Sequence, residues 1–383
     1  VRGFVRRVEE RQWVTNGRRA RILTFILGIV IFIESNITVL VSGAVGRPLF
    51  DRFRISREKL AYLIDSTSAP ICVLIPLNAW GAYVLGILGE LGVEDPLGTF
   101  ITAIPLNFYA IAAVILAGIT AFTGLALGPM KAAEARTQRG EIVWEGATPM
   151  VDPEILAPAP ETRIPERAIN MIVPVVVMVL FMPLGLYITG NGDITKGTGS
   201  TAVLWAVGAG LATAWIMLLA QRAFSVDSLT KTALKGAGGL IGLAFLLLLA
   251  LALSDVSNTL GTGVFIAGVT AELLPPVVFL PLVFLTSSAI ALATGTSWGT
   301  FGIMLPIAVP AAVALGLPVA PFAAAALSGG IFGDHASPIS DTTIISSMVA
   351  ATDHIDHVRT QLPYATIAAT IATIGFAIVG ATL

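Results

Sequence analysis

The stretch SGGIFGDHASPISDTTIISSMVAATDHIDHVRTQLPY, residues 328–364, is the most informative part of the chain. It holds all three histidines of the protein, and two of its four aspartates, Asp334 and Asp341, lie within a run that is otherwise hydrophobic enough to lie in a membrane. A charged side chain at the centre of a bilayer costs roughly 2.5–3.5 kcal/mol even on lenient insertion scales. Both aspartates are therefore candidates for a functional role.

The composition around this stretch is that of a membrane protein. Of the 383 residues, 55% are hydrophobic and only 12% are charged, whereas soluble proteins carry about 25% charged residues. Runs such as Ile241–Leu253 are apolar on every face, which excludes the alternating pattern of a membrane barrel. We therefore expect an all-α, polytopic membrane protein. Its single cysteine, Cys72, excludes an internal disulfide.

Windows of about 20 apolar residues mark the expected membrane segments. Three of these windows are too long for a plain span, and polar or helix-breaking residues interrupt them at Glu34–Asn36, Thr294–Thr300 and Asp334–Pro338. We expect broken helices at these three places. The windows are 22–50, 60–89, 99–128, 168–188, 200–220, 236–254, 276–316, 320–350 and 362–383.

Lysine and arginine predict the orientation, since cytoplasmic loops carry an excess of both. Residues 1–21 contain seven and residues 47–59 contain five, so segment 22–50 is expected to be a re-entrant hairpin that enters and leaves on the cytoplasmic side. Residues 255–320 contain none, which predicts that a second hairpin, 276–316, enters from outside. The expected cytoplasmic segments are 1–21, 51–59, 129–167, 221–235 and 352–361.

Hairpins that enter from opposite faces predict two inverted repeats with discontinuous transmembrane helices. Asp65–Ile71 follows the first hairpin and Asp334–Ile339 follows the second, and both contain an aspartate followed by serine, proline and isoleucine. The expected units are a first repeat at 1–128 that lacks its N-terminal part, a cytoplasmic linker at 129–167, connecting transmembrane helices at 168–233, and a second repeat at 234–383 with the broken helix 320–350.

The residues at the breaks indicate a cation site. Hard cations prefer oxygen ligands, and the stretch TGTSWGT supplies four hydroxyl groups, from Thr294, Thr296, Ser297 and Thr300, next to glycines that let a helix unwind. Packing between membrane helices also uses small and hydroxyl residues, and this alternative stays open. Pro338 lies between Asp334 and Asp341 and frees backbone oxygens near both. A proton is then a rival to a metal ion at these carboxylates.

The other polar residues allow two interpretations each. Glu34, the one charge inside the first hairpin, indicates function or an ion pair. Asp65 is either a site residue or a solvated cap near Lys59. His335 is a proton relay, a ligand or a bystander. For His354 and His357 in the motif DHIDH, a place at the expected cytoplasmic boundary favours a solvated loop or pH sensing over zinc binding.

Four motifs resemble the NhaC-type sodium/proton antiporters: RPLFDRFRISREKLAYLIDSTSAP (47–70), ATGTSWGT (293–300), GDHASPISDTT (333–343) and DHIDHVRTQLPYA (353–365). The resemblance covers nearly the whole chain. It implies membership of the ion transporter superfamily, with two inverted repeats, hairpins that meet at the substrate site, and an elevator-like movement of that site. The chain departs from the family at Ala336, where a cysteine is expected, and at Glu34–Asn36, where relatives carry an aspartate pair. Members of the family also exchange carboxylic acids such as malate and lactate, or amino acids.

We therefore expect a secondary active transporter and not an enzyme. The favoured hypothesis is sodium/proton antiport with alternating access, in which Asp334 and Asp341, helped by Glu34, bind sodium or protons in competition. The open alternative is sodium- or proton-coupled exchange of organic acids or amino acids. A metalloenzyme built on the histidines is disfavoured because their expected depths differ. The residues expected at the ion or substrate are Asp334, Asp341, Ser337, Ser340, Thr342, His335, Glu34, Asn36, Thr294, Thr296, Ser297, Thr300, Asp65 and Ser66, with sodium held by Asp334, Asp341, Thr296 and Ser297.

The expected partners follow from this hypothesis. They are the lipid bilayer of the cell (inner) membrane and small ions or small organic anions, with no nucleic acid and no cofactor beyond the transported sodium and protons. A homodimer is compatible with it. Because the chain starts at a valine and shows no signal-peptide pattern, we also expect that a further N-terminal segment precedes it.

Overall fold

The computed structural model describes residues 14–32, 34–76, 78–149, 167–193, 197–239 and 276–383, with a few single positions between 252 and 260. Every regular element in these ranges is a helix, so the all-α prediction is confirmed. The expected segment 236–254 lies mostly outside the described residues. The helices are α2 (Gly17–Val30), α3 (Ser35–Arg52), α4 (Arg57–Ser66), α5 (Ala69–Leu74), α6 (Ala79–Glu90), α7 (Pro96–Ala103), η1 (Ile104–Leu106), α8 (Phe108–Thr123), α9 (Pro129–Gln138), α11 (Ile169–Thr189), α12 (Gly199–Ala220), α13 (Val226–Gly239), α16 (Pro276–Thr294), α17 (Ser297–Ala314), α18 (Val319–Ala336), α19 (Asp341–Ala350) and α20 (His354–Thr382).

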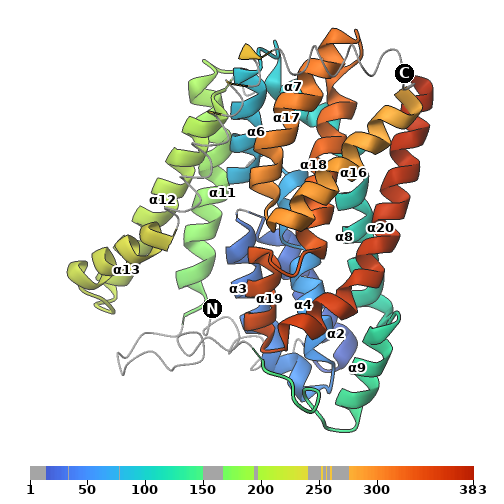
Figure 1. Ribbon diagram of the computed structural model, residues 1–383. Helices are drawn as coiled ribbons and strands as arrows, with labels where there is room; N and C mark the ends of the chain where they lie inside the picture. Colours follow the sequence, from blue (N-terminus) through green and yellow to red (C-terminus); the bar gives the residue numbers. More distant parts are fainter. Residues whose placement is uncertain are drawn as a thin grey trace.

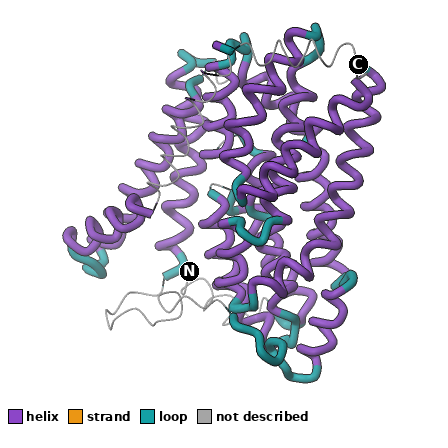
Figure 2. The backbone as a smooth tube through the Cα atoms, in the orientation of Figure 1, coloured by secondary structure: helices purple, strands orange, loops and turns teal. Residues whose placement is uncertain are grey.

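Several of these helices are long and apolar enough to cross a membrane. Within the described ranges, α11, α16, α17 and α20 each qualify alone, and two bent pairs would add one span each. One pair joins Arg57–Leu74 to Ala79–Glu90, and the other joins Pro96–Leu106 to Phe108–Thr123. Figure 2 shows non-helical backbone at mid-height in the bundle as well as at its two ends. Backbone of this kind is tolerated at membrane depth only where it is buried in protein or lines a cavity.

The first expected hairpin is formed by α2 and α3. Glu34 begins α3 as its N-cap, and its carboxylate accepts a hydrogen bond from Ile37 N at 3.0 Å. The Thr38 hydroxyl donates to the backbone oxygens of Ile31 and Glu34, which joins the end of α2 to the start of α3. The polar residues of the break thus satisfy the backbone groups that the two helix ends leave free.

The second hairpin turns between α16 and α17, and its break is shorter than the sequence suggested. Gly295 has φ +68°, a conformation that favours glycine, and Thr296 caps α17. These two residues complete the turn, so Gly299, which was expected to help unwind the helix, lies inside the first turn of α17. A single left-handed glycine is enough to reverse the chain here.

The two hairpins lie toward opposite ends of the bundle. Figure 1 shows α2, α3 and α4, in blue, in its lower half, and α16, α17 and the start of α18, in orange, in its upper half. Each hairpin is followed by a broken helix: α4 and α5 are separated at Thr67–Ser68, and α18 and α19 at Ser337–Ser340. This is the arrangement that inverted repeats require, while the boundaries of the two repeats stay a prediction.

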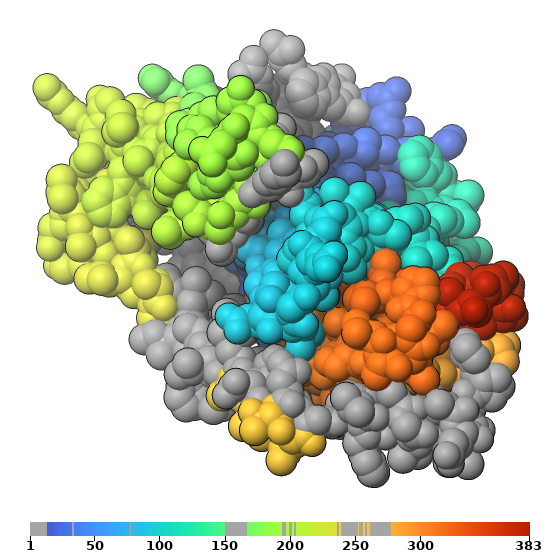
Figure 3. All heavy atoms as spheres, turned by 90° about the horizontal axis from the view of Figure 1, so that it is seen from above, coloured from blue at the N-terminus to red at the C-terminus, as the bar shows by residue number. Residues whose placement is uncertain are grey.

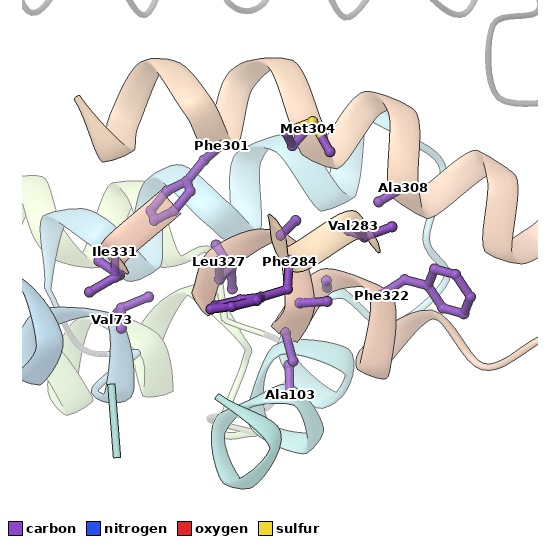
Figure 4. Packing of buried hydrophobic residues seen from close by; sticks show 14 of the residues in the cluster. Val73, Ala103, Val283, Phe284, Phe301, Met304, Ala308, Phe322, Leu327 and Ile331 are labelled. Carbon is purple, nitrogen blue, oxygen red and sulfur yellow. The ribbon is translucent and has the colours of Figure 1, made fainter. Parts of the chain in front are cut away.

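The core around the second hairpin is built on small residues of α18. Figure 4 shows side chains of α16, α17 and α18, among them Phe284, Phe301 and Leu327, packed together with Val73 of α5 and Ala103 of α7. Residues 323–326 of α18 are all alanine and are buried. Small residues allow membrane helices to approach closely, which brings α18 against both arms of the hairpin.

Gly333 gives a test of this close packing. A Cβ atom at this position would collide with the backbone oxygen of Ser288 and lie 2.6 Å from the Ala291 Cβ. We expect Gly333→Ala to lower the free energy of unfolding by about 1–3 kcal/mol, because neither backbone can yield without moving its helix. Thermal unfolding in detergent measures this. Gly86→Ala in α6 is the matched control, since no atom lies within 4 Å of its added Cβ, and an equal loss in both variants would contradict the explanation.

Three segments expected to be loops are helical. Within the linker 129–167, α9 forms because Arg136 and Met130 are buried against the rest of the protein. Helix α13 occupies most of the expected loop 221–235, and α20 begins at His354, inside the expected loop 352–361. Helices α11, α12 and α13 lie together on one side of the molecule in both Figure 1 and the view from above in Figure 3. The functional candidates belong to the other helices.

Candidate functional site

Asp334 lies at the end of α18, where the tip of the second hairpin reaches the broken helix. Its side chain is 1% exposed. One carboxylate oxygen, Oδ2, accepts a hydrogen bond from the Ser297 hydroxyl at 2.7 Å, and Ser297 is the first residue of α17. The other oxygen, Oδ1, has no hydrogen-bond partner among the described residues. A buried carboxylate oxygen in this condition is costly unless a proton or a cation joins it.

Asp341 is the accessible carboxylate of the site. It is the first residue of α19, is exposed, and its Oδ1 accepts a hydrogen bond from Thr342 N at 2.8 Å. Ser340 caps the same helix, and its hydroxyl lies 3.1 Å from that of Thr342. Both Asp334 and Glu34 are near enough to Asp341 to interact with it electrostatically. Three carboxylates from three broken or reversed helices therefore lie in one region.

Asp65 takes the corresponding position in the first broken helix. It is 1% exposed, near the end of α4, and its Oδ2 accepts hydrogen bonds from Gln361 at 2.7 Å and from Thr343 at 3.3 Å. Its Oδ1, like that of Asp334, has no partner among the described residues. The alternative of a solvated cap near Lys59 is wrong, because Lys59 pairs with Glu134 at 3.1 Å, near the opposite end of α4.

His335 connects the two broken helices to α8. Its Nε2 lies 3.1 Å from the Ser66 hydroxyl and 3.9 Å from Asp65 Oδ2, and its Nδ1 lies 2.7 Å from the Tyr109 hydroxyl. The ring is 3% exposed. Ser66 and His335, both expected at the site, are thus in contact although they lie 269 positions apart in the sequence. Asp65 lies next to both.

Some expected site residues satisfy their polar groups locally instead. Ser337 donates to Leu292 O, which ties the end of α18 to α16, and Asn36 donates to Glu34. Thr300 donates to Thr296 O and the exposed Thr294 to Ile290 O, each within its own helix. Such bonds to the carbonyl one turn earlier are the ordinary use of hydroxyls in helices. The structure brings neither threonine hydroxyl to a carboxylate.

Four residues that contact the site were missed: Tyr109, Thr343, Gln361 and His357. The expectation of a solvated loop at His357 is wrong, since its side chain is fully buried and its Nε2 lies 3.9 Å from Asp65 Oδ2. A helical reading of DHIDHVRTQ would have placed Gln361 one turn after His357, on the same face. Tyr109 had no such signal, because its contact spans 226 positions.

The histidines do not form a recognisable metal centre. Among the residues that the structure describes, no group of three or more His, Cys, Asp or Glu side chains could hold a metal ion. The expected difference in depth between His335 and His357 is wrong, because both rings lie 3.9 Å from Asp65 Oδ2. The observed arrangement is a set of carboxylates and imidazoles joined by hydroxyl and amide groups.

Comparison with known proteins gives one family. The model of the Na+/H+ antiporter family matches residues 87–381. An uncharacterized protein of Haemophilus influenzae is 33% identical over 96% of this chain and 72% of its own length. The arginine/ornithine antiporter ArcD of Halobacterium salinarum is 32% identical over 55% of this chain and 41% of its own length. The malate-2H(+)/Na(+)-lactate antiporter of Bacillus subtilis is 38% identical over 28% of this chain and 23% of its own length.

A solved structure also resembles the chain. The YdaH transporter of Alcanivorax borkumensis, described as having an unusual topology, aligns with a TM-score of 0.42 and 14% sequence identity. The alignment covers 94% of this chain and 85% of that structure.

Proposed function

The chain belongs to the Na+/H+ antiporter family, and we propose that it exchanges sodium ions for protons across a membrane. Membership makes it a multi-pass membrane protein and a secondary antiporter. The choice of sodium and protons rests on the site. The observation that carries it is the buried Asp334 carboxylate, which has one oxygen bound to Ser297 and the other without a partner among the described residues.

A carboxylate in this position has two ways to become satisfied. A proton on Oδ1 removes the charge, and a sodium ion neutralises it while the Ser297 hydroxyl and backbone carbonyls at the breaks supply further oxygens. The two ligands compete because each neutralises the same charge. Asp341 and Glu34 add negative charge nearby and favour entry of a cation from the accessible side. Thr296 is not proposed as a sodium ligand, since its hydroxyl caps α17 and its backbone oxygen already accepts hydrogen bonds from Thr300.

Alternating access is the second part of the proposal. Asp334, Asp341 and Asp65 all lie at breaks between helix segments, and α18 and α19 carry two of them on either side of one break. A small change in the angle between segments would move the carboxylates relative to both ends of the bundle. The end of the bundle that carries α9 and the start of α20 would face the cytoplasm. Arg139 directly follows α9, and Arg52 ends α3 four residues before Ser56, whose backbone N donates to Glu134 of α9.

Exchange of an organic acid or amino acid is the second candidate. Helices α3, α17 and α19 all begin at the breaks around the carboxylates, and a helix N-terminus favours a bound carboxylate group. Two relatives are named for organic substrates, arginine and ornithine in one and malate and lactate in the other. Because Glu34, Thr296 and Ser340 already cap these helices, we rank this candidate below sodium/proton exchange.

The test is transport by the purified protein in sealed vesicles. We expect a sodium pulse to drive protons out of acid-loaded vesicles, as measured with a trapped pH-sensitive dye, and lithium and potassium to be compared in the same assay. Labelled malate, lactate and arginine are offered in parallel with and without sodium. Saturable uptake of one organic substrate, combined with no proton movement on addition of sodium alone, would replace the first proposal by the second.

A further inference from the structure

The two histidines of the motif DHIDH meet at one hydroxyl group. The Ser347 Oγ lies 2.9 Å from His357 Nδ1 and 3.0 Å from His354 Nδ1. Ser347 and His357 are fully buried, whereas His354 is partly exposed at the first position of α20. On the inner side, His357 Nε2 lies 3.9 Å from Asp65 Oδ2. His354, Ser347 and His357 therefore form a connected series from the surface to the buried carboxylate of Asp65.

The hydrogen-bond partners fix which nitrogen of each ring carries a proton. The Gln361 amide nitrogen donates to Asp65 Oδ2 and to His335 O, both at 2.7 Å, so its oxygen faces His357 Nε2 at 2.9 Å. A carbonyl oxygen only accepts, and His357 must donate from Nε2. His354 Nε2 likewise faces Pro338 O at 2.5 Å and must donate. Each neutral ring then has an unprotonated Nδ1.

The Ser347 hydroxyl consequently has one proton, while three neighbouring atoms can accept a hydrogen bond from it. Its single hydroxyl proton is shared among Thr343 O at 2.8 Å and the two Nδ1 atoms. The hydroxyl oxygen, however, accepts two hydrogen bonds as readily as it donates one. The arrangement becomes fully hydrogen-bonded only when an added proton sits on Nδ1 of His357 or of His354 and is donated to Ser347. The hydrogen-bond geometry therefore accommodates one proton more than the neutral network carries.

We propose that His354, Ser347 and His357 form a proton relay that loads and unloads Asp65 from the end of the molecule where α20 begins. The inference rests on the proposed sodium/proton exchange and assigns its proton route. It also adds Asp65 as a second proton carrier, which interacts electrostatically with Asp334, the carboxylate at which sodium and a proton compete.

The transfer is balanced at each step. A proton from water protonates His354 at Nδ1, and this N–H bond then breaks as the proton passes to Ser347 Oγ. The hydroxyl proton of Ser347 moves at the same time to His357 Nδ1. His357 now carries protons on both nitrogens. Its Nε2–H, which donates to Gln361 Oε1 at 2.9 Å, turns toward Asp65 Oδ2, 3.9 Å from Nε2, and this N–H bond then breaks as Oδ2 gains the proton. The ring is left neutral with its proton on Nδ1, and the reverse sequence restores it.

The charged and titratable groups around the relay favour movement of a proton inward to Asp65 and its release when sodium binds. His357 faces Asp65 of α4, His335 of α18 and His354 of its own helix. Asp65 in turn interacts with Asp341, Asp334 and Tyr109. At the outer end, Asp356 interacts with Asp353, Glu58, Arg136 and Arg359. A proton on the relay is thus attracted inward by carboxylates, and a sodium ion bound among those carboxylates repels it.

The first experiment separates proton movement from sodium movement. His357→Gln keeps a hydrogen-bonding side chain but carries no transferable proton. We expect it to slow sodium-driven proton flux by about tenfold or more and to flatten its dependence on pH, while exchange of labelled sodium for unlabelled sodium at equal pH stays near the wild-type rate. Wild-type proton flux with an unchanged pH profile would overturn the relay.

The bridging hydroxyl has a matched control one position away. Ser347→Ala removes the relay oxygen, whereas Ser346→Ala removes a buried hydroxyl that has no partner among the described residues. We expect only Ser347→Ala to reproduce the loss of proton flux. Equal effects of the two substitutions would show that packing, and not proton transfer, is responsible.

A measurement that needs no sodium separates this inference from the proposed function. Nitrogen NMR of the histidine-labelled protein is expected to show His357 with its proton on Nε2 at high pH and a second proton on Nδ1 at low pH, with the midpoint shifted by His354→Gln. Wild-type vesicles without sodium-driven proton flux would end the proposed function, and with it the coupling of the relay to sodium. A His357 that is unaffected by His354→Gln would end the relay itself.

Discussion

Asp334→Asn is expected to abolish sodium-driven proton movement while leaving the abundance of the protein unchanged. Asparagine has nearly the same shape, and its side-chain oxygen still accepts the hydrogen bond that Ser297 donates to Asp334 Oδ2 at 2.7 Å. It carries no charge, however, and cannot exchange a proton. Removing one partner of a buried charge pair costs about 3–5 kcal/mol, which corresponds to a loss of more than about 100-fold in sodium affinity.

The measurement is the sodium pulse into acid-loaded vesicles, with the amount of reconstituted protein determined in the same samples. Asp227→Asn is the matched control, because this aspartate makes only an exposed ion pair with Lys231, one turn later on α13. We expect the control to transport at the wild-type rate. Transport by Asp334→Asn at a rate close to that of the control would show that the sodium ion binds elsewhere.

The contrast between Asp334 and Asp65 bears on how the exchange is coupled. Both carboxylates lie in the corresponding broken helices, both are 1% exposed, and each has one oxygen without a partner among the described residues. Their second oxygens differ, since Asp334 is held by a serine of the hairpin tip and Asp65 by Gln361 of α20. The two aspartates thus differ in their surroundings, because only Asp65 has two imidazoles, those of His335 and His357, each 3.9 Å from its Oδ2 among the described contacts.

The breaks in the helices could be predicted from the sequence because their residues act locally. Glu34, Gly295 and Pro338 end or begin helices through their own backbone and side-chain chemistry, which neighbouring residues are sufficient to specify. Asp334 and Ser297 were both predicted at one ion site, and the structure places them in hydrogen-bond contact; their role as a site stays a prediction. It overestimated the break at 294–300, because it could not tell that one left-handed glycine would complete the turn.

The contacts made by the α20 side chains and by Tyr109 could not be predicted in the same way. Gln361 reaches Asp65 across 296 positions, and Tyr109 reaches His335 across 226. Such contacts depend on how whole helices pack, which a single sequence does not specify. His357 was expected in a solvated loop for the same reason, because its neighbours Asp353 and Arg359 are polar and partly or fully exposed. Only the position of α4 places a carboxylate on the other side of His357.

Helix α9 is another element whose burial is determined by a distant partner. The guanidinium group of Arg136 binds both carboxylate oxygens of Glu58, at 2.7 and 3.0 Å, and both side chains are almost completely buried. The same guanidinium donates to the backbone oxygens of Glu141 and Ile142 and lies over the ring of Trp144. The hydrogen bonds of the Arg136 guanidinium nitrogens therefore form only when the linker is folded against α4.

Arg136→Met is expected to destabilise the protein by about 3–5 kcal/mol, because it leaves the Glu58 carboxylate buried without its partner. Thermal unfolding in detergent, followed by tryptophan fluorescence, measures the loss. Arg139→Met makes the same substitution one residue beyond the end of α9, where the pair with Glu141 is well exposed. Exposed pairs contribute only about 0–1 kcal/mol, so this control should unfold near the wild-type temperature.

The double variant Arg136→Met with Glu58→Gln distinguishes the charge from the packing. If the loss comes from an unpaired carboxylate, removing that charge should restore a large part of the stability, because a buried amide is far less costly to desolvate than a carboxylate. A double variant as unstable as Arg136→Met alone would instead assign the loss to the bonds with Glu141 and Ile142 and to the contact with Trp144. Glu58 lies in the first turn of α4 and Asp65 in its last. Restored stability should therefore be accompanied by restored sodium-driven proton flux if α9 acts only by holding α4 in place.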